Sequence, residues 1–224
     1  MKERERLTLG KMQNPVRGFL HGSAAVISAI GGVALWVRAE SDPARQLALL
    51  VFALSLVGLY TASSLYHCVP WQPAWKGRMQ RIDHSMIYVL VAGTYTPISF
   101  VVLDGTVRIV ALGVVWGIAA VGIFQKFAYP SVGLWFSITM QMFQGWFGVL
   151  FFTPLAERLP APALYLLGLG GILYSVGMVT LVTERPSLWP HVFSYHEVFH
   201  VFVIGGSVAH YTMTLVYVAP FVLL

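Results

Sequence analysis

The feature that most constrains this chain is a succession of apolar stretches, each long enough to cross the hydrocarbon core of a bilayer. A transmembrane helix needs about 20 consecutive, mostly apolar residues. Seven stretches meet this requirement: Arg17–Val37, Leu47–His67, Ile82–Leu103, Val107–Lys126, Val132–Phe152, Ala163–Val182 and Ser194–Pro220. The connectors between them are short and rich in proline, glycine and aspartate, which interrupt helices. We therefore predict an all-α bundle of seven membrane-spanning helices that forms a single domain over residues 1–224.

The composition supports a membrane protein and excludes soluble classes. The chain is 57% hydrophobic and 10% charged, whereas soluble domains are typically about 45–50% apolar and about 25% charged. The single cysteine, Cys68, cannot form an internal disulfide, so the sequence predicts no disulfide-stabilised secreted domain. The net charge of +5 comes from short basic clusters between apolar stretches, a distribution that sets membrane topology and does not predict nucleic-acid binding.

The distribution of basic residues predicts the orientation of the bundle. With the N-terminus inside, ten Lys and Arg residues fall on the inner side: Lys2, Arg4, Arg6, Lys11, Arg17, Lys76, Arg78, Arg81, Lys126 and Arg185. Four fall on the outer side: Arg38, Arg45, Arg108 and Arg158. Basic residues favour the cytosolic side. We therefore expect residues 1–16 to form a short basic cytosolic segment, the first stretch to be a retained span, and the C-terminus to lie outside.

Three of the stretches carry ionisable residues toward the same membrane face. His196 and His200 begin the seventh stretch four residues apart, so they lie on one helical face about 6 Å apart along the axis. Ser63 and His67 end the second stretch with the same spacing, and Asp83 begins the third. Ionisable residues in membrane spans are costly and are therefore candidates for function. The predicted topology brings all five residues to one depth near the inner face.

This set of residues predicts a zinc site. Zinc is commonly bound by imidazole, and catalytic sites use three protein ligands with one position left for water. We assign His67, His196 and His200 as the ligands. The alternative is that these histidines only form hydrogen bonds at the level of the lipid head groups. The sequence gives no comparable reason to include Cys68 or the other histidines, which are His21, His84, His191 and His210.

The same motifs resemble the progestin and adipoQ receptor (PAQR) family. The motifs are the Ser63/His67 pattern, Asp83 at the head of the third stretch, and the His196/His200 pair. The strings Arg81–Ser85 and Ala92–Pro97 resemble the bacterial haemolysin III branch of that family. The resemblance extends over essentially the whole chain. It implies seven spans with a cytosolic N-terminus, location in the bacterial cytoplasmic membrane, and a zinc ion held by the three histidines beside Ser63 and Asp83.

The resemblance also implies a link to ceramidase-like lipid hydrolases and to membrane-lipid homeostasis. The protein would then act as a zinc-dependent hydrolase of lipid amides or esters, with membrane lipids as substrate or ligand. Asp83 or Glu197 would transfer the proton, and Ser63 would orient the water or the oxyanion. The receptor members carry no acid where Glu197 stands, so the resemblance does not decide between the two carboxylates.

Three alternatives to a lipid hydrolase follow from the same residues. The first is a lipid or small-ligand sensor in which zinc only braces the helix ends. The second is an ion-coupled transporter. The third is an intramembrane metalloprotease, because Glu197 completes a His-Glu-x-x-His string and residues Leu103–Gly105 form a Leu-Asp-Gly motif. The predicted topology argues against the protease, since Asp104 falls at the opposite membrane face, about 30 Å from the histidines.

Overall fold

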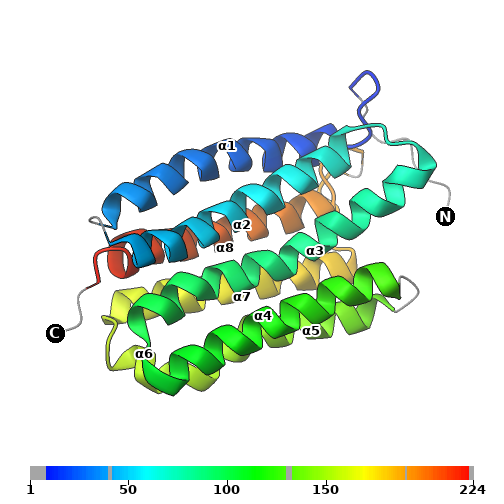
Figure 1. The fold of residues 1–224 in the computed structure, drawn as a ribbon. Helices are drawn as coiled ribbons and strands as arrows, with labels where there is room; N and C mark the ends of the chain where they lie inside the picture. The colour runs from blue at the N-terminus through cyan, green and yellow to red at the C-terminus, as the bar shows by residue number, and fades with distance from the viewer. Residues whose placement is uncertain (1–8, 40–41, 130–132, 190, 222–224) are drawn as a thin grey trace.

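The computed structural model describes residues 9–39, 42–129, 133–189 and 191–221, which form a bundle of helices (Figure 1). The α-helices are α1 (Pro15–Arg38), α2 (Pro43–Cys68), α3 (Pro73–Pro97), α4 (Gly105–Ala128), α5 (Leu134–Trp146), α6 (Phe152–Ala156), α7 (Ala161–Thr183) and α8 (Tyr195–Met213). Short π or 3₁₀ segments adjoin three of them: η1 (Ile98–Val102), η2 (Phe147–Phe151) and η3 (Thr214–Val218). The described residues contain no β-strand, which confirms the all-α prediction. Three basic residues of the predicted cytosolic segment, Lys2, Arg4 and Arg6, lie outside the described residues.

Six helical segments of the described chain are long and apolar enough to cross a membrane. They are Pro15–Arg38, Pro43–Cys68, Pro73–Val102, Gly105–Ala128, Ala161–Thr183 and Tyr195–Val218. They correspond to every predicted span except the fifth. Several begin earlier than the apolar pattern predicted, because a proline such as Pro15, Pro43 or Pro73 occupies the first turn. Proline is well tolerated there, since the amides of a first turn have no partner within the helix.

The predicted fifth span, Val132–Phe152, is the one that differs. Its described part is divided into α5, the 3₁₀ segment η2 and the five-residue helix α6. The hydroxyl group of Tyr95 on α3 accepts a hydrogen bond from the amide of Gly148 and donates one to the carbonyl oxygen of Gly145. A little further on, Pro154 has no amide hydrogen to continue the α-helical pattern. The two features explain why this region is not one regular α-helix.

The helices differ in how much of their surface is buried within the bundle. Helix α2 packs against α1 and α3, α3 packs against α4, and α8 packs against α7 and α1. In the most apolar 18-residue stretch of each segment, 56% of the residues of α2 and 61% of those of α3 with η1 are buried, against 17% for α1. Apolar side chains of α1, such as Ile27 and Ile30, point outward and are exposed. An apolar outer surface is what a helix in contact with lipid requires.

One end of the bundle brings together segments that are far apart in the sequence. Helices α1, α3 and α8 begin at this end and α2 finishes there (Figure 1). Helix α4 ends and α5 begins on the same side of the molecule (Figure 1). The predicted site residues lie toward this end of their helices, with Asp83 about three turns into α3, so the fold collects them in one region.

Candidate metal centre

The three predicted histidine ligands meet at this end of the bundle. His67 comes from the last turn of α2, while His196 and His200 come from the first two turns of α8. One candidate ligand atom from each of the three lies within 4.8 Å of the other two. Their ring centroids are 5.0–5.2 Å apart. His67 and His200 are buried, and His196 is partly exposed.

This arrangement fits a tetrahedral metal ion. Nitrogen ligands at 2.0–2.1 Å from zinc are separated by about 3.3 Å from one another, so small side-chain movements would suffice to close the group. The Nδ1 atom of His200 is buried and has no hydrogen-bond partner among the described residues. A buried polar atom without a partner is uncommon in folded proteins and calls for an explanation. A metal ion held by His67, His196 and His200 would provide one.

Ser63 and Asp83 lie next to the histidines. Ser63 precedes His67 by one helical turn, and Asp83 comes from the adjacent helix α3. Both side chains are buried, and the Ser63 hydroxyl group interacts with the Asp83 carboxyl group. Both residues line the same cavity as His196 and His200. The carboxyl group of Asp83 therefore faces the space in front of the histidines.

Glu197 has a different environment from Asp83, although it adjoins His196 in sequence. Its Oε1 atom accepts a hydrogen bond from Nε of Arg17 on α1 at 2.6 Å, and the pair is buried. Its Oε2 atom accepts hydrogen bonds from the amide and the hydroxyl group of Ser194, at 2.7 and 2.6 Å. The Ser194 contacts form a capping box, which satisfies amides at the start of α8. Both carboxylate oxygens are thus engaged in contacts that hold α8 to α1 and cap its first turn.

His21 is a neighbour of the cluster that the sequence did not assign to it. Its ring stacks on the ring of His200, with centroids 3.8 Å apart, and meets the ring of Tyr60 edge-on at 4.9 Å. Both ring nitrogens of His21 are buried. The sequence places His21 at the inner end of the first span, but it does not reveal that α1 packs against α8. That contact is what brings His21 to the site.

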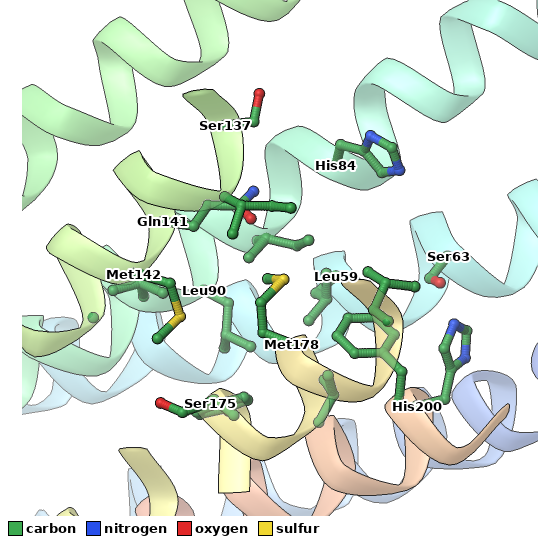
Figure 2. Close-up of a pocket in the computed structure, with 18 of the residues that line it drawn as sticks. Leu59, Ser63, His84, Leu90, Ser137, Gln141, Met142, Ser175, Met178 and His200 are labelled. Carbon is green, nitrogen blue, oxygen red and sulfur yellow. The ribbon is translucent and has the colours of Figure 1, made fainter. Parts of the chain in front are cut away.

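A cavity of about 400 Å³ opens beside the histidine cluster. Ligand sites in proteins commonly have volumes of about 300–1,000 Å³. Figure 2 shows Ser63 and His200 at one side of the cavity, with Leu59, Leu90, Met142 and Met178 along its length. Most of its surface is apolar. The histidines therefore stand at the edge of a space suited to a hydrocarbon chain.

The remaining polar residues singled out in the sequence are distributed as follows. His84, which the sequence did not assign to the zinc site, lines the cavity on the side of α3. His210 also lines the cavity, and its Nε2 atom lies 3.1 Å from the carbonyl oxygen of Leu167. Asp104 forms an ion pair with Arg158 at 2.7 Å, at the end of the bundle where α4 begins (Figure 1). Cys68 is a free thiol outside the histidine group.

Comparisons with known proteins point to one family. A sequence profile described as "Haemolysin-III related" matches residues 10–211, a range that includes every residue of the histidine cluster and its neighbours. The chain is 36% identical over 167 residues to a Bacillus subtilis (strain 168) protein named "Hemolysin-3 homolog", covering 75% of each chain. It is 31% identical over 217 residues to "Hemolysin-3" of Bacillus cereus, covering 96% of each chain.

Proposed function

The chain belongs to the haemolysin-III related family of membrane proteins, and from this premise we propose that it is a zinc-dependent hydrolase of lipid amides or esters. The observation that carries the proposal is the histidine cluster, with Asp83 and Ser63 beside it, at the edge of a largely apolar cavity. A lipid could place its acyl chain in the cavity and its amide or ester carbonyl group near the histidines. The physiological role would then be membrane-lipid homeostasis.

In this proposal His67, His196 and His200 hold the metal. Bound zinc supplies Lewis acidity, which polarises a carbonyl group and makes water a usable nucleophile near neutral pH. A carboxylate oxygen of Asp83 takes the proton that the water loses and returns it to the nitrogen or oxygen of the leaving group. The Ser63 hydroxyl group orients the Asp83 carboxyl group, with which it interacts. The apolar cavity wall excludes other water from the reacting bond.

We also propose that the protein crosses the bacterial cytoplasmic membrane seven times. The segment from α5 to α6 would serve as an interrupted fifth span, with the N-terminus and the histidine cluster at the cytosolic face. The ten-to-four distribution of basic residues supports this orientation. In a Cys68→Ser background, a cysteine near Arg78 should resist an impermeant thiol reagent in intact cells, and one near Arg158 should react. The opposite labelling pattern would mean that the bundle has the inverse orientation, with the histidine cluster at the outer face.

A second candidate function is a lipid sensor in which the metal only braces the bundle. Its support is that the three histidines join the end of α2 to the beginning of α8. A metal held there would fasten two helices regardless of any chemistry.

A hydrolysis assay distinguishes the two functions. The purified protein is incubated with a panel of labelled lipid amides and esters, before and after removal of metal by a chelator. The hydrolase predicts that the chelator abolishes product formation and that added zinc restores it. A protein that retains its zinc but hydrolyses no member of the panel would support the sensor.

A further inference from the structure

A second polar group lines the cavity, away from the histidine cluster. It consists of Lys126 from α4, Ser137 and Gln141 from α5, and Gln80 and His84 from α3, and we refer to it as the lysine wall. Figure 2 shows Ser137 and Gln141 across the cavity from His200, with His84 above Ser63. The proposed hydrolysis uses none of these residues. Lys126 is also one of the basic residues predicted at the inner face, and polar groups that line a cavity near a membrane face are candidates for ligand binding.

Lys126 is the cation of this wall, and its position is defined by hydrogen bonds. Its Nζ atom donates to Oγ of Ser137 at 2.7 Å, and the same Oγ atom lies 3.5 Å from Oε1 of Gln125. His84 lies close enough to interact electrostatically with the ammonium group. Within the part of the chain that the structure describes, no carboxylate forms an ion pair with Lys126. An ammonium group has three donors, so capacity remains for an anionic ligand.

The acidic residues of the cavity do not neutralise this cation. Asp83 interacts with Ser63, on the side of the histidine cluster. Glu184 follows the last turn of α7 and is exposed to solvent. The lining therefore has Asp83 with His196 and His200 on one side and a partly buried cation with amide and hydroxyl groups on the other. Apolar side chains such as Leu90 and Met178 lie between them.

We propose that the lysine wall binds the anionic head group, a carboxylate or a phosphate, of an amphiphile whose hydrocarbon chain occupies the apolar part of the cavity. Lys126 supplies the charge, and the side-chain amide of Gln141 supplies a further hydrogen-bond donor. A charge-assisted hydrogen bond is shorter and stronger than a neutral one, so the wall selects an anionic ligand over a neutral one with the same chain. If the anionic amphiphile is the substrate, this inference rests on the proposed hydrolase. The binding of an anionic amphiphile at the lysine wall does not depend on hydrolysis.

A competition assay with matched ligands tests the selectivity. The protein is placed in nanodiscs of phosphatidylcholine, and tritiated palmitamide serves as the neutral tracer. Unlabelled palmitamide, palmitate and hexadecyl phosphate are the competitors, all with the same sixteen-carbon chain. We expect at least one of the two anions to displace the tracer at about one-tenth of the concentration that palmitamide needs, a difference of about 1.4 kcal/mol. The stronger of the two identifies the head group as a carboxylate or a phosphate.

Substitutions at Lys126 show whether this residue causes the preference. Lys126→Met should still bind palmitamide, which reports an intact cavity, but should bind the anions no better than palmitamide. Lys126→Arg retains the charge and should retain the preference. Lys76→Met is the matched control, because Lys76 is exposed at the start of α3 and does not line the cavity.

The results separate this inference from the proposed hydrolase. Three results would overturn the lysine wall as an anion site. They are equal displacement of the tracer by all three ligands, a preference for the anion that survives Lys126→Met, and no binding of the tracer to the unmodified protein. His196→Ala/His200→Ala should lose zinc and hydrolysis while keeping the preference for the anion. If the preference is present but the unmodified protein hydrolyses no lipid, the hydrolase fails and the binding site stands.

Discussion

The two ends of the bundle both carry charged residues, but they use them differently. At the end where α4 begins, Arg158 donates hydrogen bonds to Asp104 and to the carbonyl oxygen of Val102, and the Asp104 side chain is 59% exposed. Arg45 and Arg108 likewise donate to backbone carbonyl oxygens in that region. At the histidine end, by contrast, the Arg17–Glu197 pair, Asp83, His67 and His200 are all buried.

The comparison indicates that the charged residues at the end where α4 begins support the fold, whereas ionisable groups at the histidine end are available for chemistry. Arginines at the far end satisfy carbonyl oxygens where helices finish, a favourable and inexpensive arrangement near water. At the histidine end, burial removes ionisable groups from water, which costs free energy. For Arg17 and Glu197 the ion pair between them gives a structural reason for this burial. Asp83 forms no ion pair within the described residues, and it lines the same cavity as His196 and His200. The predictions below test this division, beginning with the largest effect.

The largest effect is expected from removal of two metal ligands. About one zinc ion per chain should copurify with the unmodified protein, and His196→Ala/His200→Ala should lose nearly all of it along with hydrolysis. His191→Ala is the control, since His191 is exposed in the loop before α8, and it should retain the metal. Elemental analysis by mass spectrometry measures the ratio. Full zinc occupancy in the double variant would mean that the cluster is not the metal site.

Neutralising Asp83 should stop the chemistry without removing the metal. Asp83→Asn leaves the three histidines in place but deprives the site of its base, an effect typically of 10²–10⁴-fold on the rate. Zinc content and the turnover of a labelled lipid should be measured on the same preparation. Loss of zinc together with activity would instead make Asp83 part of the metal site.

The sequence predicted six of the helical spans and the meeting of the histidines, because both depend on local regularities. An apolar run of about 20 residues and a four-residue spacing can be recognised without knowledge of neighbouring helices. The contact of Tyr95 with Gly145 and Gly148, one of the two features that interrupt the fifth span, could not be predicted, since it depends on how α3 packs against this region.

The environments of single polar residues were predicted less well, for a related reason. The position of His21 beside His200 depends on the contact of α1 with α8, and the position of His84 in the cavity depends on α3, α4 and α5 packing around it. Spacing along one helix gives the direction of a side chain only relative to that helix. Which neighbour it meets is decided by the packing of the bundle. For the same reason the sequence left open the choice between Asp83 and Glu197.

Glu197→Gln should affect stability more than chemistry. Glutamine can keep the capping contact with Ser194, but it leaves Arg17 as a buried charge without its partner, which costs roughly 3–5 kcal/mol. Denaturation in mixed micelles measures this loss. Arg17→Met/Glu197→Gln should cost less than the sum of the two single changes, because the unpaired charge is gone. A rate loss as large as that of Asp83→Asn, with stability unchanged, would make Glu197 the proton-transfer group.

The smallest effect is expected at the opposite end of the bundle. Asp104→Asn removes one member of an exposed ion pair, and such pairs contribute roughly 0–1 kcal/mol. Arg158 retains its hydrogen bond to the carbonyl oxygen of Val102, so the loss should fall at the lower end of that range. Zinc content and hydrolysis should be unchanged.

This variant also tests the metalloprotease alternative, in which Asp104 would be the third ligand beside His196 and His200. Loss of zinc in Asp104→Asn would mean that Asp104 contributes to the metal site, which would contradict the separate roles of the two ends. Retained zinc would leave His67, one turn beyond Ser63, as the third ligand.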